Sequence, residues 1–184
     1  MRSTEIRTWL LADPTLELSS AARQRLEVSY QMLDAADAEL GPLRDQLAKF
    51  ATRQPACRTL INEHYGVGPV TSVAVWSELG DCQRFTRSDQ AVRHSGLDVT
   101  IYSSNDRRSG GYLSRQGPAT LRWAVYEAGK CASRSTSPDY DYYQQVRCRH
   151  NGKRAALSVA RKILRRCYHT LRNLDTDIVY TVPS

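Results

Sequence analysis

Long apolar segments are missing from this sequence, and so is any N-terminal pattern typical of a secretory leader. A helix that spans a bilayer needs about twenty predominantly apolar residues, and no stretch of the 184-residue chain approaches that composition. A leader combines a basic start with an apolar core, which the first residues do not contain. We therefore expect a soluble, cytoplasmic protein that does not associate with a membrane.

Cysteine is also sparse, and its spacing gives no sign of a disulfide framework or a metal site. The chain has five cysteines, an odd number, and none belongs to a Cys-x-x-Cys pair. Such cysteines fit reduced thiols in a cytoplasm. Two Cys-x-His sequences, beginning at Cys148 and Cys167, do not have the spacing of structural zinc sites. We predict no metal ligands among them.

Basic residues outnumber acidic ones, with 26 lysines and arginines against 19 aspartates and glutamates and a formal net charge of +7. This balance favours a polyanionic partner such as DNA or structured RNA. Much of the excess falls on a helix expected from about residue 153 to residue 174, whose apolar stripe leaves the cations on its other side. Either these cations contact phosphates or they form an ordinary solvated surface. The predicted nucleic-acid contacts on this helix are Lys153, Arg154, Arg161, Lys162, Arg165 and Arg166.

Leucines recur every seven residues near the start of the chain, at Leu26, Leu33, Leu40 and Leu47. This spacing is typical of a short coiled-coil seam. Gly41-Pro42 interrupts the seam, and because a proline removes a backbone donor and clashes with the preceding turn, we expect a kink or two consecutive helices. The seam either joins copies of the chain or packs against its own domain, since so few heptads do not decide between the two.

Residues 57–79 have the pattern of a helix, a tight turn and a second helix. Gly66 and Gly68 allow the turn to adopt positive φ and to approach a phosphate, and Pro69 opens the second helix with its N–H groups exposed. Such a helix-hairpin-helix grips the nucleic-acid backbone without reading bases. A plain pair of packed helices is the alternative, because two glycines are a weak signal.

One serine, Ser114, lies in a basic, glycine-rich turn ahead of a predicted helix. Residues 97–102 alternate like a strand and lead into a polar loop. Gly117-Pro118 marks a helix start, because proline is tolerated only in the first turn. The Ser114 hydroxyl would then lie beside free N–H groups and arginines that attract a phosphodiester, although an ordinary loop residue or helix cap fits as well. The arginines nearby in sequence are Arg107, Arg108, Arg115 and Arg122.

Several short motifs follow one another in an order that resembles a known family. The series covers roughly residues 55–173 and resembles the C-terminal transposase domain of insertion-sequence recombinases that carry an N-terminal DEDD domain and are guided by a bridge RNA. The motifs are His64-Tyr65-Gly66-Val67-Gly68-Pro69-Val70-Thr71, Leu79-Gly80-Asp81, Arg84-Phe85, Ser95-Gly96-Leu97, Ser114-Arg115-Gln116-Gly117 and Leu121-Arg122, with a late basic helix after them.

The resemblance implies that Ser114, which matches the serine of the family's Ser-Lys/Arg-x-Gly motif, is a nucleophile that attacks a DNA phosphodiester. Arg115 and Arg122 would neutralise charge on the phosphoryl oxygens, and N–H groups near Gly117 would add fixed donors. The partners it implies are DNA, a guide RNA and further copies of the chain, held through the helical arm as a homo-oligomer.

One feature of that family is missing here. Its members begin with a nuclease fold whose acidic residues bind magnesium, whereas this chain opens at Met1-Arg2-Ser3-Thr4-Glu5 without alternating strands and helices. We also find no cluster of carboxylates spaced to hold two metal ions. We therefore expect that this chain binds no cofactor itself, that magnesium comes from an acidic domain absent here, and that the chain alone binds DNA without cutting it.

Together these patterns predict a mostly α-helical protein with a helical arm over residues 1–54, a serine-containing transposase domain over residues 55–174 and a tail over residues 175–184. The transposase domain is expected to combine a helix-hairpin-helix-like segment, a short β-like loop and a small helical bundle. Its predicted function is DNA strand exchange. The alternatives are a nucleic-acid-binding remnant without catalysis, whose binding would survive loss of Ser114, and a helical oligomerisation module.

Overall fold

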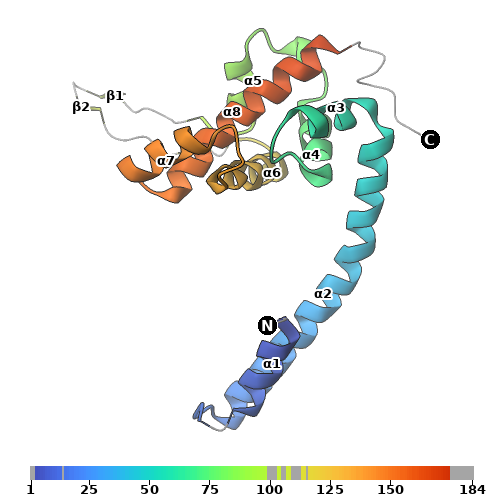
Figure 1. The fold of residues 1–184 in the computed structure, drawn as a ribbon, viewed down its shortest axis with the longest axis vertical. Coiled ribbons are helices and arrows are strands. Elements are labelled where there is room, and N and C mark those ends of the chain that lie inside the picture. Colours follow the sequence, from blue (N-terminus) through green and yellow to red (C-terminus); the bar gives the residue numbers. More distant parts are fainter. Residues whose placement is uncertain are drawn as a thin grey trace. The chain divides into compact units, whose positions relative to one another are not determined.

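The computed structural model of the chain describes residues 3–13, 15–98, 103–104, 107–108, 113–114 and 116–174. Helices dominate these residues, which confirms the mostly α-helical prediction (Figure 1). The chain divides into two compact units, Met1–Gln46 and Leu47–Ser184. The elements are α1 (Ser3–Ala12), α2 (Ser20–Arg53), α3 (Pro55–Glu63), α4 (Pro69–Leu79), η1 (Cys82–Arg84), α5 (Ser88–His94), β1 (Ser103–Ser104), β2 (Arg107–Arg108), α6 (Ala119–Lys130), η2 (Cys131–Ser133), α7 (Tyr140–Arg149) and α8 (Gly152–Asn173).

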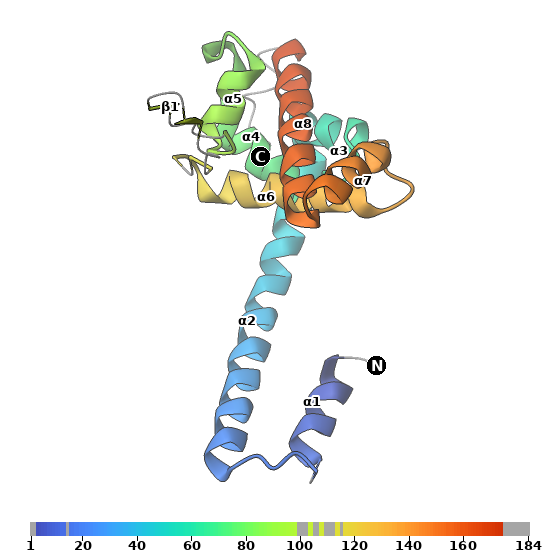
Figure 2. The same ribbon diagram turned by 90° about the vertical axis from the view of Figure 1, so that its left-hand side faces the viewer.

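In the N-terminal unit, α1 lies beside the first half of α2 (Figure 2). Arg7 of α1 hydrogen-bonds Asp34 of α2, and its guanidinium lies over the Tyr30 ring, 5.1 Å from the ring centroid. α2 passes through Pro42 as one helix, so the expected alternative of two consecutive helices is wrong. Pro42 is exposed, and solvent can therefore satisfy the carbonyl that loses its backbone donor.

At the centre of the second unit, α8 contacts α3, α4, α5, α6 and α7 (Figures 1 and 2). Its first turn is capped by Asn151, whose side chain accepts a hydrogen bond from the N–H of Arg154 at 2.9 Å. Its apolar residues recur three and four positions apart, so one face is buried, as the sequence predicted. That face consists of Ala155, Ala156, Val159, Ala160, Ile163, Leu164, Cys167, Tyr168 and Leu171.

Close contact between α6 and α8 depends on Gly129. A Cβ at this position would lie 2.4 Å from the Ala156 carbonyl oxygen and 3.0 Å from the backbone nitrogen of Ala160. Those are backbone atoms that cannot swing aside as a flexible side chain can, so only glycine fits between the two helices. The small side chains of Ala156 and Ala160 complete this crossing.

Asp139, just before α7, is a buried carboxylate held by two cations of α8. Its side chain is 5% exposed. Arg166 donates two hydrogen bonds to it, at 2.7 and 2.8 Å, and Lys162 donates a third at 2.8 Å. The Arg166 hydrogen bonds hold the pKa of Asp139 below its ordinary value, although burial acts in the opposite direction. Since a buried charge is tolerated only when it is paired, this cluster fastens the start of α7 to α8.

Replacing Asp139 with asparagine should destabilise the second unit, because Arg166 and Lys162 would then face a neutral amide. Removing one partner of a buried ion pair costs up to about 3–5 kcal/mol. Both cations here are partly exposed, which reduces the cost, so we expect the Asp139→Asn variant to lose about 1–3 kcal/mol of unfolding free energy in urea.

Lowering the pH should reduce the difference in unfolding free energy between the wild type and Asp139→Asn. The carboxyl pKa is depressed in the folded protein, so its stabilisation is complete above the ordinary carboxyl pKa and is lost as the pH falls through the folded value. The unfolding free energies of wild type and variant should therefore converge below about pH 4. Asp89→Asn, which removes an exposed carboxylate from Arg165, is the matched control. Equal losses from the two substitutions would contradict a special role for the Asp139 cluster.

Candidate functional site

Ser114 is attached twice to a single residue, Asp98. Its backbone N–H donates to the Asp98 carbonyl oxygen at 3.0 Å, and its hydroxyl donates to Oδ1 of the Asp98 carboxylate. The two residues are sixteen positions apart, and Ser114 is half-buried. The serine predicted as the nucleophile is therefore held at the base of the loop that it ends, with its hydroxyl proton directed at a carboxylate.

The loop between Asp98 and Ser114 carries the short strands β1 and β2. They pair antiparallel, with Ser103 opposite Arg108 and Ser104 opposite Arg107, which agrees with the predicted β-like loop. Arg107 and Arg108 thus belong to β2. Arg115, the other predicted arginine of this region, lies outside the described residues.

Gly117 packs directly against the end of α5. A Cβ on Gly117 would lie 2.1 Å from the His94 carbonyl oxygen and 2.8 Å from the Ser95 carbonyl carbon. Any side chain would push the entry to α6 away from α5. The sequence predicted that Gly117 offers backbone donors to a phosphate. Its geometry gives it a packing role as well, because it brings the segment after Ser114 against the segment before Asp98.

Two guanidinium groups hold the backbone between α5 and Asp98. Arg122 of α6 donates through Nη1 to the carbonyl oxygens of Ser95 and Gly117, both at 3.3 Å. Arg161 of α8 donates through Nε to the Leu97 carbonyl oxygen at 2.6 Å. Burial lowers the pKa of Arg161. Both arginines were predicted to contact phosphates, and in the folded chain each one anchors this backbone.

Positive charge also reaches the carboxylate that accepts from Ser114. Arg93 lies with Nε 3.9 Å from Oδ2 of Asp98, and its side chain is 82% exposed. The Asp98 side chain is 27% exposed. The two carboxylate oxygens therefore have different neighbours, with Oδ1 facing the serine hydroxyl and Oδ2 facing a solvated guanidinium.

The predicted helix, tight turn and helix are present as α3, residues 64–68 and α4. Gly66 has φ +84°, and a Cβ there would lie 2.8 Å from the Ala128 carbonyl oxygen of α6, so glycine is needed at this turn. Gly68 is the N-cap of α4 without a side-chain cap, and Pro69 follows at the first helical position. Nothing lies within 4 Å of a Cβ placed on Gly68. Gly66 thus serves packing, and Gly68 stands at an open helix start.

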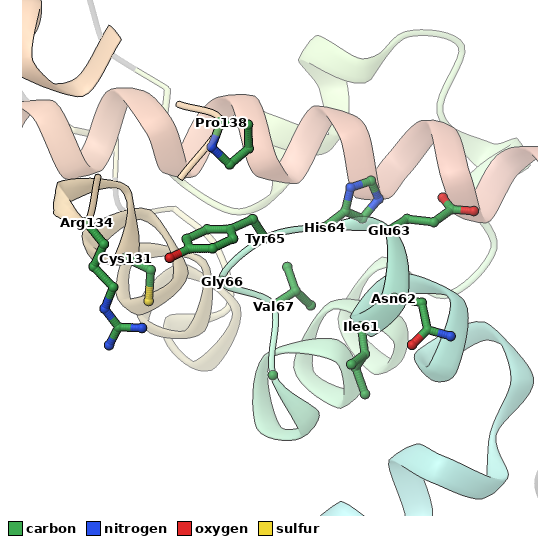
Figure 3. Close-up of a pocket in the computed structure, with 11 residues that line it drawn as sticks. Ile61, Asn62, Glu63, His64, Tyr65, Gly66, Val67, Cys131, Arg134 and Pro138 are labelled. Atoms are coloured by element: carbon green, nitrogen blue, oxygen red, sulfur yellow. The ribbon is translucent and has the colours of Figure 1, made fainter. Parts of the chain in front are cut away.

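A cavity of about 690 Å³ adjoins this turn. Figure 3 shows Tyr65 and Val67 of the turn on one side and Arg134 and Cys131 on the other. The Tyr65 hydroxyl lies 2.8 Å from the Thr136 hydroxyl, which joins the turn to the segment after η2. On the opposite flank, Nε2 of His64 lies 2.9 Å from the Thr170 hydroxyl of α8. The turn is therefore braced on both sides by side-chain hydrogen bonds.

The α8 cations predicted to form a nucleic-acid surface are largely engaged with the protein itself. Arg165 donates to Asp89 of α5 at 2.7 Å, and Lys162 and Arg166 bind Asp139. Lys153 and Arg154 are exposed at the start of α8, with Arg154 Nη1 3.3 Å from Nδ1 of His150. Three of the α8 cations that the sequence assigned either to phosphate contacts or to a solvated surface thus form ion pairs within the protein.

Among the described residues, no three or more His, Cys, Asp or Glu side chains are grouped so that they could hold a metal ion. Within the same residues, none of the helices is both long and apolar enough for a bilayer. Neither Asp98 nor Arg93 was predicted from the sequence as a residue of the site. The one sequence signal for Asp98 is its position directly after the Ser95-Gly96-Leu97 motif. Its contact with Ser114 has no local signature, because the two residues are sixteen positions apart.

The region that holds Ser114, Asp98 and the α3–α4 turn can be compared with known proteins. Residues 58–144 match the family described as Transposase IS116/IS110/IS902. The chain is also 25% identical over 125 residues to the transposase for insertion sequence element IS1111A of Coxiella burnetii (strain RSA 493 / Nine Mile phase I). That alignment covers 68% of this chain and 34% of the relative, so the chain spans about a third of the length of that transposase.

Substituting alanine for Gly117 tests how the Ser114 segment is held. The new methyl group would meet the His94 and Ser95 backbone, and overpacking of this kind typically costs about 1–3 kcal/mol. We expect the Gly117→Ala variant to unfold at lower urea concentration and to lose hydrogen-exchange protection at the Ser114 amide. Gly68→Ala, which meets no neighbour within 4 Å, is the matched control. Unchanged protection at Ser114 in Gly117→Ala would show that this packing does not hold the serine.

Proposed function

We propose that this chain provides the serine-bearing part of an insertion-sequence transposase, in which Ser114 attacks a DNA phosphodiester and forms a covalent phosphoserine. The observation that carries the proposal is the placement of the Ser114 hydroxyl, which is half-buried, fixed through the backbone and directed at a carboxylate. The family match over residues 58–144 contains this serine and supports the proposal. A covalent intermediate preserves the energy of the broken bond for rejoining the DNA.

DNA would be bound mainly through its phosphates. In this proposal the open start of α4 at Gly68 offers N–H groups to one phosphate. Lys153, Arg154 and the strand arginines Arg107 and Arg108 add positive charge, and Arg115 belongs to the same set. Arg122 supports the site through the backbone of Ser95 and Gly117, and a phosphate contact from its remaining N–H groups forms part of the proposal.

Magnesium and a guide RNA are assigned in this proposal to other parts of the recombinase. A two-metal centre requires several carboxylates at close range, and the described residues contain no such group. We therefore infer that an acidic domain, on the same or another polypeptide, supplies the metal-binding carboxylates. This chain would contribute the hydroxyl and the backbone that holds it.

The nucleophile can be tested by trapping the covalent adduct. The chain would be combined with the acidic domain of a related insertion-sequence transposase, its guide RNA, magnesium and end-labelled DNA, and separated on a denaturing gel. We expect a protein–DNA adduct that disappears in Ser114→Ala, while DNA binding measured by gel shift stays nearly intact because only a hydroxyl is removed.

Ser133→Ala, which alters an exposed serine in η2, is the control and should retain the adduct. An adduct that persists in Ser114→Ala would refute the assigned nucleophile. DNA binding by wild type without any adduct would favour the alternative, a nucleic-acid-binding protein without catalysis. The engagement of Arg122 and Arg161 with backbone carbonyls is the observation that keeps this alternative in view.

We also propose that α2 joins copies of the chain. Leu33 is 51% exposed and Leu40 is 41% exposed, and Met32 and Leu43 are exposed beside them. An apolar stripe of this kind on a helix is suited to packing against an identical stripe. The charged residues around it would then remain in solvent.

The substitution Leu33→Asp should break this contact, because a carboxylate buried without a partner in a helix seam is costly. We expect light scattering to show a smaller particle and circular dichroism to show an unchanged helix content. Gln31→Asp adds the same charge at an exposed position of α2 and should leave the mass unchanged. Equal masses for wild type and Leu33→Asp would refute self-association through the seam, and loss of helix would assign Leu33 to the core instead.

A further inference from the structure

Asp98 is placed differently from Asp13 and Asp81, two other aspartates at turns of this chain. Asp13 accepts from the backbone N–H of Thr15, and Asp81 accepts from that of Gln83, each two residues ahead. These are ordinary turn contacts. Oδ1 of Asp98 instead accepts from the hydroxyl of a residue sixteen positions away. The role of a local turn does not account for this long-range contact.

The contact is also more than a way of holding the loop closed. The backbone N–H of Ser114 already donates to the Asp98 carbonyl oxygen at 3.0 Å, which fixes the register of the two segments. In the additional side-chain bond the serine is the donor, so the lone pairs of Oγ remain available. That is the arrangement a nucleophilic hydroxyl requires from a proton acceptor.

The backbone that leads to Asp98 is anchored by contacts from α5 and α8. Leu97, the preceding residue, is fully buried, and its N–H donates to the Val92 carbonyl oxygen at 3.3 Å. Its own carbonyl oxygen receives the 2.6 Å hydrogen bond from Arg161. Arg93 approaches the far carboxylate oxygen, Oδ2, at 3.9 Å. The carboxylate is therefore presented to Ser114 by an anchored main chain, and an exposed guanidinium lies near its second oxygen.

We propose that Asp98 positions the Ser114 hydroxyl and accepts its proton during attack on phosphorus, an inference that rests on the proposed nucleophilic function of Ser114. As the bond from Oγ to phosphorus forms, the hydroxyl proton passes to Oδ1 of Asp98. The bond from phosphorus to the leaving DNA oxygen breaks, and its electron pair stays on that oxygen, which takes a proton from water. Asp98 afterwards returns its proton to solvent.

The reactivity of Ser114 can be measured on the full chain without DNA by using a small alkyl fluorophosphonate. Attack by Oγ forms a serine–phosphorus bond and expels fluoride, while the hydroxyl proton is transferred to the acceptor. Trypsin cleaves after Arg108 and after Arg115 and so releases residues 109–115 as one peptide, which contains both Ser109 and Ser114. Mass spectrometry measures the labelling of this peptide, and the part that is lost in Ser114→Ala is the labelling of Ser114. Varying the probe concentration separates the maximal labelling rate from the affinity for the probe.

We expect Asp98→Asn to lower the maximal labelling rate of Ser114 by at least about tenfold, since a positioned base commonly contributes a factor of about 10²–10⁴. The affinity for the probe should stay the same, because the amide keeps the shape of the side chain and the backbone bond to Ser114 remains. Asp89→Asn removes an equal charge from the exposed pair with Arg165 and should leave the rate unchanged. A merely structural carboxylate would not produce this separation of rate from affinity.

Three results would overturn the role of Asp98: an unchanged rate in Asp98→Asn, an equal loss in Asp89→Asn, or labelling of wild-type Ser114 no faster than that of exposed Ser133. The adduct experiment with DNA is a separate test. Rapid labelling that depends on Asp98, together with no DNA adduct, would refute the transposase function while leaving the proton acceptor in place. A DNA adduct through Ser114 whose yield is unaffected by Asp98→Asn would do the reverse.

Discussion

The crossing of α6 and α8 at Gly129 fixes the geometry on which the candidate site depends. Since a Cβ at Gly129 would lie 2.4 Å from the Ala156 carbonyl oxygen, the two helices lock at short range, and each sends one arginine to the same stretch of backbone. Arg122 of α6 reaches the Ser95 carbonyl oxygen, and Arg161 of α8 reaches that of Leu97. The backbone that leads to Asp98 is thus held from two sides by helices that cannot shift independently.

Ion pairs within the fold reduce the positive charge that the α8 cations could offer to a polyanionic partner. Asp139 binds two of the α8 cations, and Asp89 binds a third, Arg165. A guanidinium that already neutralises a carboxylate contributes less to the attraction of a phosphate than a solvated one does. The net positive charge of the sequence therefore overestimates how strongly this face of α8 would attract a phosphate.

Local signals in the sequence predicted α3, α4, α6 and α8, whereas the contacts of the site join residues that are distant in sequence. Glycine before proline located the starts of α4 and α6, and the spacing of apolar residues located α8. At Pro42 the local rule against an internal proline predicted a kink or two consecutive helices, and the second of these alternatives was wrong, because α2 continues through the proline. Arg122 and Arg161 were predicted to contact phosphates because they are arginines in basic segments of the sequence. Their observed partners are backbone carbonyl oxygens, which have no sequence signature. An arginine that anchors main chain therefore cannot be distinguished in advance from one that binds a phosphate.

The contacts that hold Ser114 and Asp98 come from the helical part of the second unit. The anchors described for Ser114 and Asp98 come from α5, α6, α8 or the residues adjoining them. The hydroxyl is consequently held by contacts that begin in the helical framework. Since a misplacement of about 1 Å can cost a hundredfold in rate, the proposed attack by Ser114 would benefit from a hydroxyl that is held by packed helices.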